Sequence, residues 1–363
     1  MPFLNEHLKH IQPYKLVSQK AWHDPSTSLK LDWNESTIPP SPLVLERTLA
    51  AFESNYLHWY PDIANTKLIK KLAEYCGTEP ENILYFASSD SAHEAVCRTY
   101  LGAGDRVLAI APTYDHFRLT VETVGATFTP YRPNNPTFRA DLKDLEVQIG
   151  TTKPKLAYIC NPNNPTGTFI EADHLVAMAS RHQSTLFLID EAYIEFHPDS
   201  VSAAVNSLPN LLVSRTMSKA FGLAGFRFGY LVVHESRATE IGIVRNPKNV
   251  STFAQIAAEA ALDDVDYMRR YVANVSETRE WMRSEIEKRF GTAITSYPSN
   301  ANFLLLRFTT QVDASAFCET MAAKNMFVRG LAHLQGLDRH VRLTIGLRAQ
   351  MEQLLAAMGS SLR

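Results

Sequence analysis

Lys219 lies in a stretch whose residue types could support chemistry at a carbonyl group. The stretch is 214–230, SRTMSKAFGLAGFRFGY, and it follows the short apolar run 211–213. Its small and hydroxylated residues suit a lysine that points inward. A primary amine attacks an aldehyde when burial and positive neighbours lower its pKa, as a Schiff-base lysine requires. A single lysine is more often a solvated surface group, so the neighbouring residues must decide.

The neighbours of Lys219 could together bind a phosphate. Thr216 and Ser218 offer hydroxyl groups, and glycines at 222 and 225 allow a close approach of the backbone. Arg227 offers a planar fork that suits a phosphate dianion. An aldehyde-reactive lysine beside a phosphate site indicates pyridoxal phosphate as the cofactor.

That cofactor needs a carboxylate at its pyridine nitrogen, so that the ring can draw electrons. Residues 185–189 are predicted to form a buried strand that ends at Asp190, and open α/β sheets bind ligands at such carboxyl ends. Tyr193 follows closely, and Asn164 lies in a turn-forming cluster after the predicted strand 155–160. Both are candidate donors to the phenolic oxygen of the cofactor. Each motif alone fits a capped turn, but their order along the chain favours the cofactor site.

The segments CNPNNPTG, IDEAYIEF and TMSKAFGLAGFRFGY resemble the pyridoxal-phosphate enzymes of fold type I. They are most similar to the histidinol-phosphate aminotransferases, within the class II aminotransferases. Matching segments extend from Tyr14 to Arg342, and they are more specific for the superfamily than for the substrate. The resemblance implies an α/β fold, in which a large domain with a mostly parallel, helix-flanked sheet is joined to a smaller α+β domain.

The resemblance also implies which residues act. Lys219, Asp190 and Tyr193 would be catalytic. Backbone N–H groups of Ser89 and Asp90, at a predicted helix start, would bind the cofactor phosphate, although this chain has SSDS where the family usually has GSDE. An ordinary helix cap would have the same local sequence. The implied cofactor-binding residues are Tyr60, Ser89, Asp90, Tyr114, Asn164, Asp190, Tyr193, Thr216, Ser218, Lys219 and Arg227.

Substrate and subunit contacts follow from the same resemblance. Arg329 and Arg342 would hold the anionic end of the substrate, and Tyr14 and Asn34 of the N-terminal arm would contact it. Tyr60 lies in a YPD triplet, whose tyrosine reaches the cofactor phosphate of the neighbouring subunit in similar enzymes. The resemblance therefore implies a homodimer with shared active sites.

The implied reaction is ping-pong transfer of an amino group from an anionic amine or amino acid to a 2-oxo acid, with 2-oxoglutarate as the expected acceptor. The segment RNPKNVS has Lys248 where the family usually has tyrosine, and the arm also departs from the family pattern. An alternative therefore stays open: decarboxylation of a phospho-amino acid, or elimination or cyclisation of a hydroxyarginine-type amino acid. Lys219 and Asp190 would serve either chemistry.

The predicted elements divide the chain into three parts. Residues 1–44 form an arm and part of the small domain, 45–255 the large cofactor-binding domain, and 256–363 the C-terminal small domain. Short strands separated by helical segments predict a parallel sheet with crossover helices in the large domain. A helix is predicted at 66–76 and a long amphipathic stretch at 254–290.

Composition excludes several other functions. The chain has 363 residues, with 36 basic and 38 acidic side chains, so no basic excess favours nucleic acid, and no segment remains for a DNA-binding domain. No apolar run approaches the roughly 18 residues of a membrane span. The four cysteines lack CxxC spacing, so no metal site is predicted. A cytoplasmic protein is expected.

Overall fold

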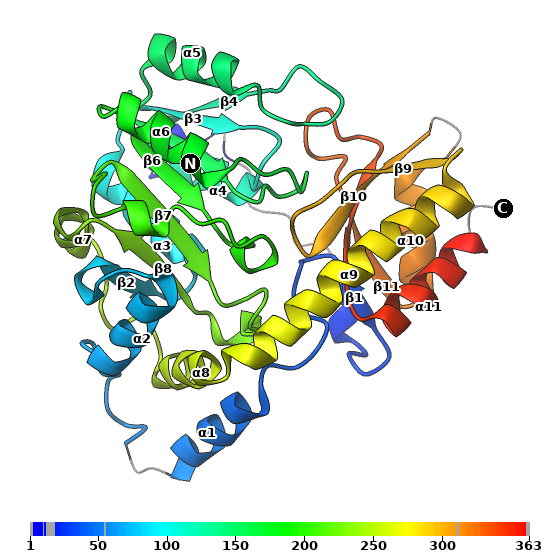
Figure 1. Ribbon diagram of the computed structural model, residues 1–363, viewed down its shortest axis with the longest axis horizontal. Helices are drawn as coiled ribbons and strands as arrows, with labels where there is room; N and C mark the ends of the chain where they lie inside the picture. Colours follow the sequence, from blue (N-terminus) through cyan, green and yellow to red (C-terminus); the bar gives the residue numbers. More distant parts are fainter. Residues whose placement is uncertain (1–2, 10, 12–18, 54–55, 310–311, 361–363) are drawn as a thin grey trace.

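The computed structural model describes residues 3–9, 11, 19–53, 56–309 and 312–360. Figure 1 shows a larger and a smaller sheet side by side, with helix α9 (Val265–Phe290) extending from one to the other. The predicted α/β class, with a mostly parallel larger sheet flanked by helices, is confirmed. Tyr14 lies outside the described residues, so its predicted contact with substrate stays a prediction.

The larger sheet has seven strands in the order β2–β8–β7–β6–β5–β3–β4. Neighbours from β7 to β4 are parallel, whereas β8 is antiparallel to both β7 and β2. Nearly every residue of β5, β6 and β7 is buried, because helices cover both faces of a parallel sheet. The strands are β2 (Ile83–Phe86), β3 (Arg106–Ile110), β4 (Thr127–Tyr131), β5 (Leu156–Cys160), β6 (Leu186–Asp190), β7 (Leu211–Thr216) and β8 (Gly229–Val233).

Helices that surround the larger sheet have clear local signals. The bounds of α2 agree with the predicted helix: the Asn65 side chain accepts the N–H of Leu68 at its start, and Gly77 ends it in the left-handed conformation at φ 65°. The helices are α1 (Pro42–Glu53), α2 (Thr66–Cys76), α3 (Ser89–Tyr100), α4 (Asp115–Thr123), α5 (Leu142–Thr152), α6 (Ala172–Arg181), α7 (Glu235–Gly242) and α8 (Thr252–Asp263).

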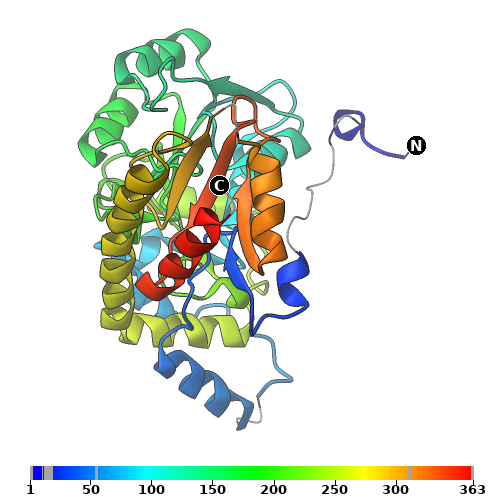
Figure 2. The same cartoon turned by 90° about the vertical axis from the view of Figure 1, so that its right-hand side faces the viewer.

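The smaller sheet has five strands in the order β1–β11–β12–β10–β9. Strand β1 comes from the N-terminal arm and pairs parallel with β11, while the other neighbours are antiparallel. Helices α9, α10 (Ala314–Ala323) and α11 (Arg348–Gly359) cover the face that points away from the larger sheet (Figure 2). The strands are β1 (Leu29–Leu31), β9 (Ile294–Ser296), β10 (Phe303–Phe308), β11 (Met326–Gly330) and β12 (His340–Thr344).

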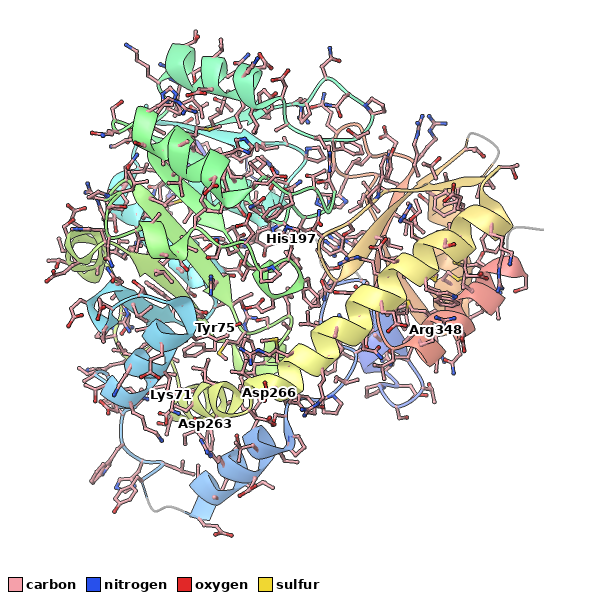
Figure 3. All side chains as sticks on the ribbon, in the orientation of Figure 1. Lys71, Tyr75, His197, Asp263, Asp266 and Arg348 are labelled. Carbon is pink, nitrogen blue, oxygen red and sulfur yellow. The ribbon has the colours of Figure 1, made fainter. Side chains whose placement is uncertain are left out.

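The predicted amphipathic stretch at 254–290 is divided into α8 and α9. The break falls at Asp264, which leaves the helical region at φ −130° and ψ 50°. Just before it, the carboxylate of Asp263 forms an ion pair with Lys71 of α2 (Figure 3). The same carboxylate forms a second ion pair with Arg47 of α1. The end of α8 therefore links two helices that are distant from it in the sequence.

A small satellite core supports the turn 331–337, which joins β11 to β12. Its buried members are Leu305, Leu331 and Leu337, and Phe138, Tyr297 and Leu334 pack against them. From the larger-sheet side of the molecule, Arg132 donates a hydrogen bond to Gln335 at 2.8 Å. The turn is thus fixed from both sides.

Within the described ranges, no helix is both long and apolar enough to cross a membrane. In the same part of the chain, no group of three or more His, Cys, Asp or Glu side chains is arranged to hold a metal ion. The domain limits near residues 44 and 255 stay a prediction.

Candidate active site

A cavity of about 540 Å³ is lined by residues of both sheets. From the larger sheet it is lined by the carboxyl ends of β5, β6 and β7, where ligands of open α/β sheets bind, and from the smaller sheet by β11 and β12. Asn34 and Tyr60 are not among the described residues that line it. The predicted residues that do are Ser89, Asp90, Tyr114, Asn164, Asp190, Tyr193, Thr216, Ser218, Lys219, Arg227, Arg329 and Arg342.

Lys219 lies half-buried on the turn after β7. Its Nζ donates a hydrogen bond to the Trp33 carbonyl oxygen at 2.8 Å and lies 5.9 Å from the centre of the Tyr193 ring. Burial lowers the pKa of Lys219 to about 8; the charge of Glu35 opposes this shift and that of Arg342 adds to it. A substantial fraction of the amine is therefore uncharged at slightly alkaline pH, as a nucleophile requires.

Asp190 is buried at the end of β6, and three donors orient its carboxylate. The Tyr158 hydroxyl donates to Oδ2 at 2.7 Å. The Ser214 hydroxyl donates to Oδ1 at 3.3 Å, and the Ala192 N–H donates to Oδ1 at 3.2 Å. His93 Nε2 in turn lies 2.8 Å from the Ser214 hydroxyl. The sequence analysis missed Tyr158, Ser214 and His93.

Donors suited to a phosphate gather at the start of α3. Among the described residues, no partner accepts a hydrogen bond from the backbone N–H of Ser89 or Asp90. The hydroxyl groups of Thr216 and Ser218, 2.9 Å apart, line the same cavity. The Arg227 guanidinium lies 3.6 Å from the Asp90 carboxylate. Free N–H groups at a helix N-terminus, with hydroxyl groups and an arginine nearby, form an anion site.

Gly229 lets β8 approach the start of α3. A Cβ atom there would lie 2.4 Å from the Ser89 nitrogen and 2.5 Å from the Ser88 carbonyl carbon, which a larger residue could not tolerate. The Ser88 side chain caps the helix by accepting the N–H of Ser91 at 3.2 Å. The stretch is therefore an ordinary helix cap and also presents two unused N–H groups. The sequence analysis did not single out Gly229.

Two tyrosines are fixed by side chains around them. Tyr193 is buried, which raises the pKa of its hydroxyl, and that hydroxyl accepts a hydrogen bond from Asn34 Nδ2 at 3.0 Å. Asn34 is itself held by the Thr344 hydroxyl. The Tyr114 hydroxyl donates to Asp90 Oδ1 at 2.9 Å. Asn34 thus orients Tyr193, and its predicted contact with substrate stays a prediction.

Arg329 and Arg342 form a pair on the side of the cavity that belongs to the smaller sheet. They are register partners on β11 and β12, and both side chains are buried. Arg342 donates to Asn164 Oδ1 at 2.5 Å and to the Asp32 carbonyl oxygen. Two guanidinium groups side by side suit a dianion with several oxygens. Asn164, predicted to reach the cofactor, contacts Arg342.

Tyr60 lies on the outer surface, with 78% of its side chain exposed. Lys248 Nζ lies 4.6 Å from the centre of its ring. The surrounding apolar side chains, here called the α1 patch, are exposed along α1 and the segment after it, at the edge of the molecule in Figure 1. The patch comprises Leu45, Leu49, Phe52, Tyr56, Leu57, Trp59, Tyr60 and Ile63.

The donor set of the cavity fits pyridoxal phosphate. Lys219 supplies an amine for its aldehyde, and Asp190 supplies a buried carboxylate for its ring nitrogen. The start of α3 supplies two N–H groups that have no partner within the part of the chain that the structure describes, and these could bind its phosphate. Amine, carboxylate and anion site are the three features that this cofactor requires of a protein.

Comparison with known sequences also indicates an enzyme that uses pyridoxal phosphate. Residues 26–358 match the family model described as aminotransferase class I and II. A dihydroxyacetone phosphate transaminase from Campylobacter jejuni is 38% identical over 356 residues, which covers 96% of this chain and 94% of the relative. A histidinol-phosphate aminotransferase from Roseiflexus castenholzii is 33% identical over 350 residues, with 95% and 92% covered.

A solved structure is similar over nearly the whole chain. The histidinol-phosphate aminotransferase from Sinorhizobium meliloti, in complex with pyridoxal-5'-phosphate, superimposes with a TM-score of 0.85 at 28% identity. The match covers 98% of this chain and 99% of that one.

Proposed function

Since the chain belongs to the class I and II aminotransferases, which use pyridoxal phosphate, we propose that it transfers an amino group to or from a small phosphate ester. The observation that carries this proposal is the buried pair Arg329 and Arg342, which shares one cavity with Lys219. Two adjacent guanidinium groups match a phosphate dianion better than a single carboxylate.

The names of the relatives reduce the candidate substrates to two phosphate esters. Dihydroxyacetone phosphate and histidinol phosphate both carry a phosphooxymethyl group on the carbon that bears the oxygen or the nitrogen. We propose dihydroxyacetone phosphate as the leading acceptor, because the relative that acts on it shares 38% identity with this chain. Glutamate would donate the amino group and leave as 2-oxoglutarate, and the product would be 2-amino-3-hydroxypropyl phosphate. Histidinol phosphate is the second candidate, supported by relatives of 30–33% identity.

Each side chain has a defined task in this proposal. When bound, pyridoxal phosphate supplies an aldehyde that condenses with amines and a ring that draws electrons from the substrate carbon. Lys219 Nζ would remove and return the proton at that carbon, since its lowered pKa suits proton transfer. Asp190 would keep a proton on the ring nitrogen. Tyr193 would donate to the phenolic oxygen, with Asn34 holding its hydroxyl in place.

The phosphate ester can be tested directly as a substrate. We expect the holoenzyme to convert dihydroxyacetone phosphate and glutamate with a kcat/KM at least about a hundredfold above that for unphosphorylated dihydroxyacetone, because the arginine pair would be left unmatched by the smaller ketone. Mass spectrometry of both products measures the reaction. Histidinol phosphate with 2-oxoglutarate, and histidinol as its control, test the second candidate in the same way.

Two results would contradict this proposal. Equal turnover of phosphorylated and unphosphorylated substrates would show that the arginine pair does not recognise the phosphate group of the substrate. Release of carbon dioxide from phosphothreonine, or loss of water from hydroxyarginine, without transfer of an amino group to a 2-oxo acid, would favour the lyase or cyclase alternative. Arg342→Lys keeps the charge but loses the fork, so it should raise the KM for the phosphate ester without abolishing kcat.

We also propose a homodimer in which Tyr60 of one subunit completes the phosphate site of the other. The α1 patch supports this proposal, because Leu45, Leu49 and Phe52 are exposed at the helical spacing of one face of α1, and exposed apolar surface of this kind is typical of protein–protein contact sites. Tyr60 is not among the described residues that line the cavity of its own chain. A second copy seated on the patch would bury these side chains and bring the Tyr60 hydroxyl to a site that needs donors.

Mixing two inactive variants tests whether Tyr60 acts across the interface. Tyr60→Ala and Lys219→Ala, each impaired alone at limiting cofactor, should regain activity after their subunits are mixed and allowed to exchange. One site of the mixed dimer would then hold Lys219 of one chain and Tyr60 of the other. Absence of recovery, with exchange verified by mass-tagged subunits, would place Tyr60 outside the shared site.

A cytoplasmic location is also proposed. All four cysteines are free thiols, and Cys76, Cys97 and Cys160 are buried. Free thiols with no disulfide fit a reducing compartment.

A further inference from the structure

His333 lies on the turn 331–337, between the two strands that carry Arg329 and Arg342. The turn is closed by a hydrogen bond from the Leu334 N–H to the Leu331 carbonyl oxygen at 2.9 Å. His333 lines the cavity and is exposed at its surface. Within the described part of the chain, its imidazole has no hydrogen-bond partner. A ring with two unused nitrogens therefore lies beside the arginine pair.

Charged groups from three elements act on this imidazole. Partial burial lowers the pKa of His333, and the positive charges of Arg329 on β11 and Arg342 on β12 lower it further. Asp115 of α4 opposes them. His116, the next residue of α4, lines the same cavity. The imidazole is therefore mainly neutral at pH 7, because burial and the two guanidinium charges both disfavour its protonated form.

We propose that His333 is the third side chain of the substrate-phosphate subsite and that it takes up a proton when the dianion binds. This inference rests on the proposed function. A dianion between Arg329 and Arg342 cancels the two charges that disfavour the imidazolium. The proton comes from solvent, and the imidazolium then donates a charge-assisted hydrogen bond to the anion.

A third side chain that gains or loses a proton, as proposed for His333, would help a ping-pong enzyme to match the charges of its two different substrates. The same cavity must receive a phosphate dianion in one half-reaction and an amino or 2-oxo acid in the other. With the dianion, two arginines and an imidazolium would face the ligand. One carboxylate group of glutamate or 2-oxoglutarate brings a single negative charge to the subsite instead of two, so the imidazole would remain neutral. His333 would thus adjust the positive charge of the subsite to the ligand.

The turn is built to hold His333 in place before any ligand arrives. Leu331 and Leu337, at its two ends, are buried in the satellite core. Gln335, near its tip, accepts a hydrogen bond from Arg132, which follows strand β4 of the larger sheet. Preorganisation of this kind saves the cost of ordering a loop on binding.

Proton uptake on binding of sulfate tests the inference. Sulfate is a tetrahedral dianion that does not titrate near neutral pH, so any proton taken up belongs to the protein. Calorimetric titration of the holoenzyme at pH 7, in two buffers of different ionisation enthalpy, counts these protons. We expect roughly half a proton or more per sulfate in the unmodified enzyme and close to zero in His333→Gln, which should bind sulfate roughly tenfold more weakly.

His116→Gln is the matched control, because it removes the other histidine of the cavity and should retain the uptake. The sign also predicts a pH profile: affinity for sulfate should fall as pH rises from the pKa of His333 in the free enzyme to its higher pKa in the complex, and stay level above that, and this fall should vanish in His333→Gln. Uptake that persists in His333→Gln would overturn the inference and leave the proposed function intact. Sulfate that does not compete with the phosphorylated substrate would also overturn the inference, whereas absence of turnover of either phosphate ester would overturn the proposed function.

Discussion

Replacement of Lys219 with alanine should reduce amino transfer by about four orders of magnitude or more, because one side chain both binds the cofactor aldehyde and moves the substrate proton. The fold should survive, since the Lys219 ammonium makes one hydrogen bond, to the Trp33 carbonyl oxygen. Turnover of the phosphorylated substrate and far-ultraviolet circular dichroism would be measured on the same preparation. Reduction of the holoenzyme with borohydride, followed by peptide mass spectrometry, locates the cofactor independently of activity.

Two controls make this result specific. Lys155→Ala removes a surface lysine that is paired with Asp105, and it should leave turnover unchanged. A small primary amine in the buffer should restore part of the activity of Lys219→Ala, because it supplies the missing base. Cofactor attached to another lysine, or turnover within tenfold of the unmodified enzyme, would show that Lys219 has neither task.

Asp190→Asn should lower kcat roughly a thousandfold, because the variant keeps the shape of the side chain and loses the buried charge that would stabilise a proton on the ring nitrogen. The Asn amide can still accept from the Tyr158 hydroxyl, so folding should change little. Comparing kcat and the cofactor dissociation constant of the two proteins separates loss of chemistry from loss of binding.

Tyr158→Phe is the matched control for this charge. It removes one donor to Asp190 Oδ2 and keeps the carboxylate, so it should cost roughly tenfold or less. If Asp190→Asn were no worse than Tyr158→Phe, the carboxylate would be needed only for packing. A large loss in the first variant with a small loss in the second would identify the charge itself as the required feature.

Residues at the carboxyl ends of parallel strands were predictable from the sequence. Asp190 and Lys219 each follow a short apolar run, and parallel strands bring their carboxyl ends to one edge of a sheet. The structure places both residues on the wall of one cavity. The pairing of Arg329 with Arg342 depends on the register of β11 and β12. The resemblance to the family implied that the two arginines act together, but the local sequence around each of them does not predict this register.

The residues that hold Asp190 could not be identified in the same way. Tyr158 lies inside the apolar strand β5 and Ser214 inside β7, where the pattern indicates only burial. A tyrosine in a fully buried strand needs a partner for its hydroxyl, and this was the one available signal. His93 is four residues beyond the start of α3, and its contact with Ser214 depends on how that helix packs on the sheet.

Short elements were missed for a different reason. Strands β1 and β9 have three residues each, too few for an alternating pattern to stand out. The stretch 254–290 is amphipathic throughout, so the break at Asp264 was not visible in the periodicity. Asn34 matched a family motif, and its side-chain amide donates a hydrogen bond to the Tyr193 hydroxyl, a contact that the motif alone did not indicate.

The turn 331–337 also makes this enzyme a favourable starting point for directed evolution. The chemical groups Lys219 and Asp190 belong to the larger sheet, whereas the turn is anchored by its own buried leucines beside the smaller one. A library confined to positions 332, 333 and 336 would vary His333, which lines the cavity, while the buried leucines, the hydrogen bond of Gln335 and the reaction centre stay constant. Evolution from a common ancestor would be able to follow the same route: substitutions at a few exposed positions of the turn would change the preferred substrate, while the residues that carry out the reaction stay the same.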